Sequence, residues 1–333
     1  MKMSEQTARR ILARPGIEVS AMGLGCWPIG GPFLLDGRQD GYGQADDAES
    51  IRALRRALDL GINVFDTSDA YGAGHSERVI GEAFKGVRDQ AFIITKFGYV
   101  PDEQKREITG TDVSPAYIRK ACEASLRRLD TDYIDMYLLH VWQLTQREEA
   151  EQVADTLEAL VKEGKIGSFG WSTDLLECAG WFAPKPHCSA IEMNLNVLQD
   201  SPELLDFCRK HDLASINRSP LAMGFLSGKF TAESFIGKDD VRGAGHAWVA
   251  FFKDGKPRQE FLDALAAIRE ILSSKGRSLV QGALAWIFAR GPHTIPVPGF
   301  KSVKQVEDLA GALQHGPLSA DQMAEIDRLL GRK

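Results

Sequence analysis

Short runs of apolar and β-branched residues recur along the chain, and segments with helical periodicity follow most of them. Eight such runs span residues 21–27, 62–68, 91–97, 133–140, 165–173, 190–196, 213–221 and 294–299. Between them, residues 46–60 and 117–129 place their apolar side chains on one face, as amphipathic helices that cover a sheet do. Repeated strand and helix units predict a parallel sheet, and eight of them favour an α/β fold of the (β/α)8 or TIM-barrel type.

An open Rossmann sheet is the competing fold, and it is disfavoured because no G-x-G-x-x-G motif follows the first run. Residues typical of helix starts lie between the apolar runs, as a barrel of alternating strands and helices requires. Ser114 and Ser201 each precede a proline, which is typical of an N-cap followed by the first helical residue. Capping-box spacing occurs twice, in the pairs Asp174 with Glu177 and Ser302 with Gln305.

Three segments lie outside this alternation. Residues 10–20 predict an N-terminal β-hairpin that would plug the bottom of the barrel. Residues 222–257, after the seventh run, contain no clear element but six aromatic residues, so we interpret them as a long functional loop. Residues 98–111 form a second long connection, which is polar. Because no domain boundary is evident, we predict one domain over residues 1–333, with its core at about 19–331.

Charge and cysteine content narrow the class of partner. The chain has 40 Lys and Arg against 46 Asp and Glu, without a one-sign block that would bind nucleic acid or a membrane, so we expect a small-molecule partner. The five cysteines are far apart, and the seven histidines form no H-x-H or H-E-x-x-H motif, which disfavours disulfides and metal. No apolar run approaches the roughly 20 residues of a membrane span, and the N-terminus lacks a signal core, so a cytoplasmic protein is expected.

Polar residues end three consecutive apolar runs. Asp66 belongs to the end of the second run, Lys96 to the third and His140 to the fourth, while Tyr71 follows Asp66 closely. The carboxyl ends of parallel barrel strands meet on one face, where active sites are built. We therefore expect these four side chains to lie close together.

These residue types form a proton-transfer device. A free tyrosine has a pKa of about 10, so Tyr71 needs a nearby cation to exchange protons at neutral pH. Lys96 would supply that charge, Asp66 would keep Lys96 protonated, and His140 would hydrogen-bond a carbonyl oxygen beside the tyrosine hydroxyl. Since no side chain provides a hydride, a cofactor must supply it.

At these residues the chain resembles the aldo-keto reductase family, and the resemblance extends from about Val19 to the last helix. It implies a long-loop member with the tetrad Asp66, Tyr71, Lys96 and His140, and NADP(H) bound in extended form across the carboxyl face of the barrel. It also implies reversible reduction of an aldehyde or ketone to an alcohol, with hydride from the nicotinamide and a proton from Tyr71.

The resemblance also implies a set of cofactor-binding residues. They are Gly25, Cys26, Trp27, Asp66, Ser172, Thr173, Glu192, Arg218, Ser219, Pro220, Leu221, Gly224, Lys229, Pro298, Gly299, Phe300, Lys301, Ser302, Gln305 and Asp308. Three residues at the nicotinamide end of this set depart from the family pattern, because Thr173 replaces an Asn, Glu192 a Gln, and Arg218 a Tyr that stacks on the nicotinamide. An ionised Glu192 can still accept a hydrogen bond from the carboxamide, and a planar guanidinium can still stack on a ring.

One corner of this set bears on the choice between NADPH and NADH. Lys301 and Ser302 offer a cation, a hydroxyl and a helix amino terminus, which in the family receive the adenosine 2′-phosphate. Gln305 stands where strongly NADPH-selective relatives have an Arg, and Leu309 where they have an Asn. A neutral Gln cannot make the charge-assisted contact of an Arg, so we expect NADPH to be preferred and NADH to be tolerated.

Aromatic residues predict an apolar-walled substrate pocket, formed by Trp27, Phe33, Tyr71, His140 and Trp142. Aldehydes, sugars, quinones and ketosteroids all fit such walls, and the oligomeric state stays open. Two alternatives come from other classes. One is a cofactor-binding regulatory subunit of the same fold with little or no turnover, and the other is a metal-dependent barrel hydrolase or isomerase.

Overall fold

The computed structural model describes residues 9–12, 14 and 16–332. Its central sheet contains eight parallel strands: β3 (Gly23–Gly25), β6 (Val64–Asp66), β7 (Phe92–Phe97), β10 (Ile134–Leu139), β11 (Ile166–Ser172), β12 (Cys188–Asn194), β13 (Ala214–Arg218) and β16 (Thr294–Pro296). These strands neighbour one another in chain order, and a parallel bridge between Gly25 and Gly299 brings the first strand to the last. Each strand overlaps one of the eight apolar runs, so the predicted (β/α)8 barrel is confirmed.

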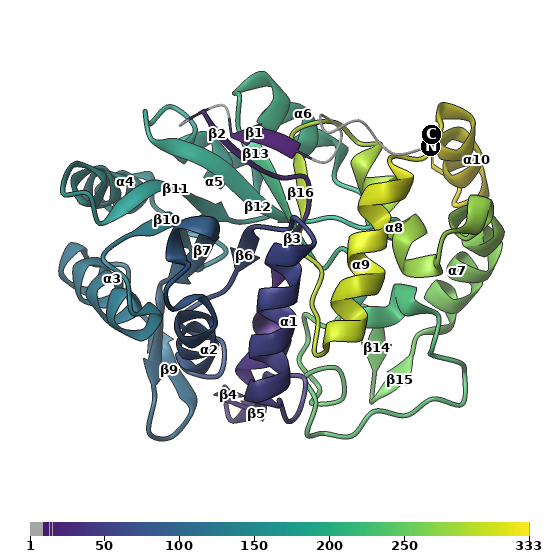
Figure 1. Cartoon of the computed structure of the whole chain (residues 1–333), viewed down its shortest axis with the longest axis horizontal. Coiled ribbons are helices and arrows are strands. Elements are labelled where there is room, and N and C mark those ends of the chain that lie inside the picture. The colour runs from purple at the N-terminus through teal and green to yellow at the C-terminus, as the bar shows by residue number, and fades with distance from the viewer. Residues whose placement is uncertain (1–8, 13, 15, 333) are drawn as a thin grey trace.

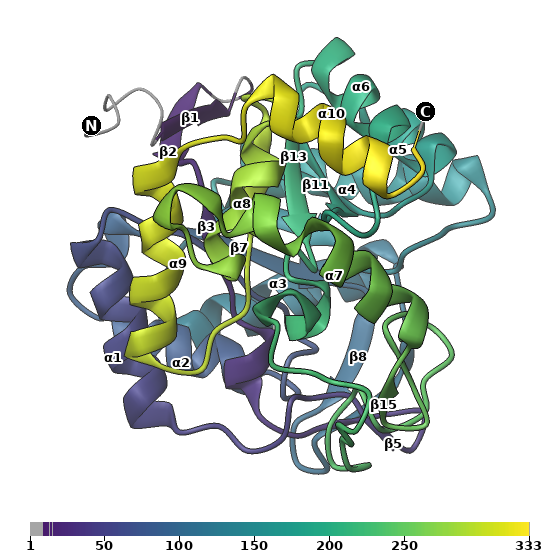
Figure 2. The same ribbon diagram turned by 90° about the vertical axis from the view of Figure 1, so that its right-hand side faces the viewer.

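Helices surround the strands, as Figure 1 and Figure 2 show from two sides. They are α1 (Asp47–Asp59), α2 (His75–Phe84), α3 (Pro115–Leu129), α4 (Arg147–Lys162), α5 (Leu176–Phe182), α6 (Pro202–Lys210), α7 (Gln259–Leu272), α8 (Leu279–Phe288), α9 (Val303–His315) and α10 (Ala320–Leu329). The two amphipathic segments predicted from periodicity are α1 and α3. Among the residues that the structure describes, no helix is both long and apolar enough to cross a membrane.

The barrel closes through a glycine on its first strand. A Cβ atom at Gly25 would lie 2.6 Å from the backbone oxygen of Val297, next to the last strand. Any larger residue would therefore push the two ends of the sheet apart.

The predicted hairpin at the N-terminus is present and packs on the barrel interior. Strands β1 (Arg9–Leu12) and β2 (Ile17–Ser20) pair antiparallel, and they lie at the top of Figure 1. Leu12 and Val19 are buried in one cluster with inward side chains of the barrel strands, including Met136. The hairpin thus closes the amino-terminal end, opposite the end where active sites of such barrels are built.

The carboxyl-terminal end of the barrel carries more secondary structure than we predicted. The polar connection 98–111 is not a loop, because it forms the hairpin of β8 (Tyr99–Asp102) and β9 (Glu107–Thr111). This hairpin joins β4 (Leu34–Leu35) and β5 (Arg38–Gln39) in a four-stranded sheet. The long loop 222–257 likewise contains a 3₁₀ helix, η4 (Ala222–Ser227), and the short pair β14 (Phe252–Lys253) and β15 (Lys256–Pro257).

Most of the predicted helix starts are present, but neither predicted capping box is complete. Gln305 accepts from the backbone of Lys301 and not from that of Ser302. Ser114 and Ser302 cap α3 and α9 through their side chains, while Ser201 occupies the N-cap of α6 without a side-chain bond. The capping box predicted at Asp174 is wrong, since α5 begins at Leu176 and its N-cap is Leu175. Asp174 instead accepts a hydrogen bond from the backbone of Asn194 and pairs with Arg218.

Candidate active site

Strand alternation aims polar side chains at the barrel axis. Five residues of the inner cluster lie two positions before a strand's polar residue: Val64, Ile94, Leu138, Ala190 and Ile216. Side chains two residues further along a strand point the same way. The residues at those positions are Asp66, Lys96, His140, Glu192 and Arg218. The barrel therefore holds a polar layer directly above its apolar filling.

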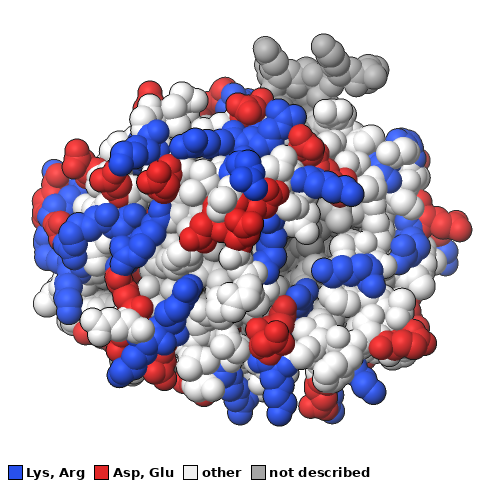
Figure 3. Space-filling view, turned by 60° about the horizontal axis from the view of Figure 1, so that its bottom comes forward, with Lys and Arg blue, Asp and Glu red and all other residues white. Residues whose placement is uncertain are grey.

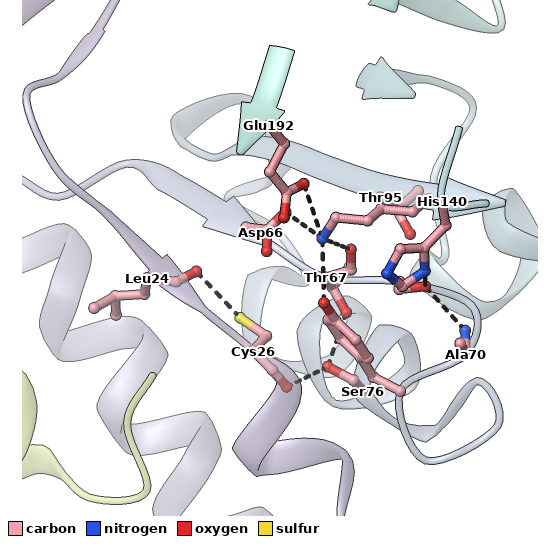
Figure 4. Close-up of polar contacts among 12 residues, drawn as sticks. Leu24, Cys26, Asp66, Thr67, Ala70, Ser76, Thr95, His140 and Glu192 are labelled. Carbon is pink, nitrogen blue, oxygen red and sulfur yellow. Dashed lines mark hydrogen bonds and ion pairs between the residues drawn. The ribbon is translucent and has the colours of Figure 1, made fainter. Parts of the chain in front are cut away.

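Lys96 lies at the centre of this layer. Its amine donates to Asp66 Oδ1 at 2.6 Å, to the backbone oxygen of Thr67 at 2.9 Å and to the Tyr71 hydroxyl at 3.4 Å. Figure 4 shows Asp66, Thr67 and Glu192 arranged around this amine. Glu192 Oε2 lies 3.4 Å from the amine as an ion-pair partner, and both Lys96 and Glu192 are buried.

Burial and these charges set the protonation states. Burial disfavours the charge of Lys96, yet Asp66 and Glu192 outweigh it and raise the lysine pKa, so Lys96 is a cation. Burial raises the pKa of the Tyr71 hydroxyl, and Lys96 opposes that shift. The Tyr71 hydroxyl is therefore protonated and neutral in this state, and the Lys96 cation lies beside it.

His140 is held as a neutral imidazole. Its Nδ1 lies 3.0 Å from the Ser68 hydroxyl, and the rings of Tyr71 and Tyr99 meet it edge-on at 5.8 and 5.1 Å. Burial, together with the positive charges of Lys96 and Arg218, holds its pKa well below the ordinary range. A neutral ring with Nδ1 engaged offers Nε2 for a contact with a ligand.

The loop that carries Tyr71 is fixed on both sides. Gly72 has φ +62°, and a Cβ atom there would collide with the backbone oxygen of Gly30, so the tight approach of these segments requires glycine. A chain of hydrogen bonds runs from Thr67 Oγ1 to Ser76 Oγ at 2.8 Å and on to the backbone oxygen of Cys26 at 2.9 Å. The backbone of this loop therefore fixes the position of Tyr71.

A buried ion pair supports the same loop from below. Glu77, at the start of α2, accepts hydrogen bonds from Thr95 and from Arg128 of α3, both at 2.6 Å. Thr95 precedes Lys96 on β7, so its hydrogen bond to Glu77 connects the strand that carries the lysine to α2, the helix that follows Tyr71.

A cavity of about 1650 Å³ opens above the polar layer. Of the residues predicted to bind cofactor or substrate, those that line it are Gly25, Trp27, Phe33, Asp66, Tyr71, His140, Trp142, Ser172, Arg218, Ser219, Pro220, Leu221, Gly224, Lys229, Gly299, Phe300, Lys301 and Gln305. One continuous space therefore connects Tyr71 with the start of α9. Figure 3 brings the carboxyl-terminal end forward and shows Lys, Arg, Asp and Glu side chains of both signs on this face.

Other predicted residues lie behind the cavity wall. Cys26, Thr173 and Glu192 are buried, and Ser302 is engaged as the cap of α9. Asp308 faces α8, where its carboxylate accepts from Gln281 at 2.9 Å.

Lys301 and Gln305, at the start of α9, are hydrogen-bonded within the protein. Its amine donates to the backbone oxygens of Tyr42 at 2.8 Å and Gln44 at 2.7 Å. Gln305 Oε1 accepts from the backbone N–H of Lys301 at 2.7 Å, while Leu309 is buried in the core. Lys301 thus joins the start of α9 to the segment after β5.

Several wall residues did not emerge from sequence patterns. The β8–β9 hairpin contributes Tyr99 and Glu107, and the long loop contributes His246 and Trp248. The ring of Trp248 lies 6.0 Å from that of Trp27. The aromatic content of the loop was a usable signal for Trp248, whereas nothing in the local pattern indicated the hairpin.

The long loop lines the cavity and is hydrogen-bonded to another segment of its wall. The backbone N–H of Val241 donates to the oxygen of Gly41 at 2.8 Å, and His246 Nε2 lies 2.8 Å from the oxygen of Gln39. These bonds join the loop after β13 to the segment that follows β4.

Within residues 9–12, 14 and 16–332, no group of three or more His, Cys, Asp or Glu side chains could hold a metal ion. The polar layer instead pairs its two carboxylates with Lys96.

A model of the Aldo/keto reductase family matches residues 21–330. Aldo-keto reductase YhdN of Bacillus subtilis (strain 168) is 30% identical over 325 residues, which cover 96% of this chain and 92% of that protein. The structure of a glycerol dehydrogenase from Gluconobacter oxydans is similar with a TM-score of 0.82 and 28% identity, covering 98% of this chain and 96% of that one. An aldo-keto reductase from Klebsiella pneumoniae in complex with NADPH is similar with a TM-score of 0.72 and 26% identity, over 98% and 96% of the two chains. The chain therefore belongs to the aldo/keto reductase family.

Proposed function

We propose that this protein is an NADP(H)-dependent oxidoreductase that reduces an aldehyde or ketone to an alcohol, reversibly, with Tyr71 as the proton donor. The observation that carries the proposal is the buried Lys96 amine, which bonds both Asp66 and the Tyr71 hydroxyl at the floor of a large cavity. A lysine held in this way has no evident structural purpose, because a buried ion pair contributes little net stability.

The residues present fit a nicotinamide cofactor. The cavity runs from Tyr71 to Lys301, and Glu192 Oε2 is buried without a hydrogen-bond partner in the described chain. Ser172 on the cavity wall would hold the carboxamide end, together with Thr173 and Glu192 immediately behind it, and Lys301 with the start of α9 would hold the 2′-phosphate. The bound cofactor supplies the hydride.

The protein's own groups move the proton. The Tyr71 hydroxyl gives its proton to the substrate oxygen, and the Lys96 cation stabilises the tyrosinate that results. Asp66 keeps Lys96 charged and oriented. In the tautomer in which Nδ1 accepts from the Ser68 hydroxyl, the neutral His140 ring donates from Nε2 to the same substrate oxygen and thereby fixes its distance from the tyrosine.

A carbonyl-substrate panel with NADPH and NADH, followed by the reverse reaction on the corresponding alcohols, tests this function directly. We expect consumption of NADPH with at least one aldehyde or ketone, and formation of NADPH from its alcohol. A protein that binds NADPH tightly but turns over no carbonyl would instead be a regulatory subunit of the same fold.

Cofactor selectivity offers a second test. We expect NADPH to be preferred over NADH by roughly ten- to a hundredfold in kcat/KM, and Lys301→Ala to remove most of that preference. The reason is that Lys301 supplies a cation beside the start of α9. Because Lys301 also bonds the oxygens of Tyr42 and Gln44, its loss should weaken both cofactors slightly.

The matched control for this test is Lys304→Ala, which removes an exposed lysine from the same helix. It should leave the NADPH to NADH ratio as in the wild type, and Gln305→Arg should widen the ratio. An unchanged ratio in Lys301→Ala would show that the phosphate site lies elsewhere.

A further inference from the structure

The Lys96 amine has more partners than it has protons. An ammonium group offers three donors. The three are directed to Asp66, to the backbone of Thr67 and to Tyr71. Glu192 is attracted to the same charge at 3.4 Å but receives no hydrogen bond on Oε2. Two buried carboxylates therefore share one cation, and only Asp66 is hydrogen-bonded by it (Figure 4).

The surrounding groups do not balance this excess of negative charge. The charged and titratable groups that act on Glu192 are Asp66 on β6, Lys96 on β7, Arg218 on β13 and Tyr71 on the loop, while His140 belongs to the same polar layer. His140 and Tyr71 are neutral. Arg218 lies at the rim, where it is already paired with Asp174 after β11.

With both carboxylates ionised, the buried centre would thus carry a net charge of about −1, which is costly in a low-dielectric site. Burial raises the pKa of Asp66 as well, but the charge of Lys96 and the short bond that its amine donates oppose this shift, so Asp66 is the carboxyl that keeps its charge. Glu192 is the group that lacks a donor, so the extra proton belongs on Glu192.

We propose that Glu192 is a titrating second counter-ion of Lys96, whose proton is displaced when the oxidised, cationic nicotinamide binds and retained when the neutral, reduced nicotinamide binds. The inference rests on the proposed function, because it needs the nicotinamide to lie against the part of the cavity wall formed by Asp66 and Ser172, with Glu192 directly behind it. Protonated Glu192 leaves the Lys96 cation free to stabilise the Tyr71 anion, and ionised Glu192 competes with Tyr71 for that charge.

The titration falls in an accessible range. Burial, and then the Asp66 carboxylate, raise the pKa of Glu192 to about 7, against the opposing charges of Lys96 and Arg218. A cation placed beside Glu192 favours its ionised form and lowers that pKa. Binding of NADP+ near neutral pH should therefore send a proton to solvent, whereas binding of NADPH should not.

Isothermal titration calorimetry in two buffers of different ionisation enthalpy measures the protons exchanged on binding. At about pH 7 we expect NADP+ to release a substantial fraction of a proton more than NADPH does. The 2′-phosphate is common to both cofactors, so its own titration cancels in the difference. Equal proton release for the two cofactors by the wild-type protein overturns the inference, whatever any variant does.

Substitutions locate the proton. Glu192→Gln should abolish the difference in proton release and raise the Kd of NADP+ relative to that of NADPH by about tenfold at about pH 8. Glu192→Asp keeps a carboxylate and should restore part of both effects. Glu203→Gln, which removes an exposed carboxylate from α6 outside the cavity, should behave as the wild type.

The pH profile of alcohol oxidation gives a second readout. Oxidation needs the ionised tyrosine as base, and Glu192→Gln frees the Lys96 charge for Tyr71, so the rising limb should move to lower pH. A limb that stays in place contradicts the assigned role. If neither NADP+ nor NADPH binds, the proposed function fails, whereas cofactor binding with identical proton counts refutes the role of Glu192 alone.

Discussion

Replacement of Tyr71 by phenylalanine is expected to lower kcat at least about a hundredfold while leaving NADPH affinity nearly unchanged. The substitution removes the hydroxyl to which Lys96 donates and keeps the ring that stacks on Trp27 at 5.7 Å. The pocket wall should therefore keep its shape, while the proton that the hydroxyl donates to the substrate is lost. Steady-state kinetics with the best carbonyl substrate, together with fluorescence titration of NADPH, measure the two quantities.

Two controls accompany this experiment. The thermal melt of Tyr71→Phe should match that of the wild type, since the loop is held through Gly72, Thr67 and Ser76 rather than through the hydroxyl. Tyr133→Phe, at an exposed position before β10, should keep wild-type turnover. If Tyr71→Phe retains most of its turnover, Tyr71 is not the proton donor.

Lys96→Met is expected to be as damaging to turnover, because the tyrosinate loses its cation, and it should also make stability depend on pH. Removing one partner of a buried ion pair costs about 3–5 kcal/mol, since the charge left behind has no compensation. Here two carboxylates, Asp66 and Glu192, would be left.

The sign of the pH dependence follows from their protonation. Without Lys96, the pKa values of both carboxyls in the folded protein lie above their unfolded values of about 3.9 and 4.3. The folded protein then keeps protons that the unfolded chain releases, so the free energy of unfolding falls as pH rises from those unfolded values toward the folded ones. We expect the Tm of Lys96→Met, relative to wild type, to drop from about pH 5 to about pH 8.

A double variant separates this effect from a general loss of packing. Adding Glu192→Gln to Lys96→Met removes one of the stranded carboxyls and should recover part of the stability at the higher pH. Lys304→Met, at an exposed site on α9, should melt as the wild type at both values. A Tm deficit of the same size at both pH values would mean that Lys96 acts by packing and not by charge.

The local sequence pattern was sufficient to predict the barrel and the meeting of Asp66, Tyr71, Lys96 and His140 at one end of it. Each strand is a short apolar run, and a parallel barrel brings the ends of its strands to one face whatever the connections contain. Asp66, Lys96 and His140 could thus be placed together from their positions at three consecutive strand ends. Tyr71 followed because it lies on the short loop after the first of them.

The local pattern was misleading where a distant partner decided the structure. Asp174 has the spacing of a helix cap, but Arg218 and the backbone of Asn194 bind its carboxylate from two neighbouring strands. Residues 98–111 are polar because they form a sheet at the barrel rim, where β9 pairs with β4 from a segment more than sixty residues earlier in the chain. Propensity does not report such pairings, because they are stabilised by contacts outside the segment.

The sequence by itself determined the barrel, the hairpin that closes its amino-terminal end and the four residues that meet above its apolar filling, because strand period and chain order are local properties. The tertiary structure alone decided the charge balance of that centre. The distance of 3.4 Å between Lys96 and Glu192 joins strands β7 and β12, which are not neighbours in the sheet, across the barrel interior. The ties of Lys301 to the oxygens of Tyr42 and Gln44 likewise join opposite ends of the chain. Such contacts depend on where closure of the barrel places the side chains, and no residue pattern along the chain encodes that distance.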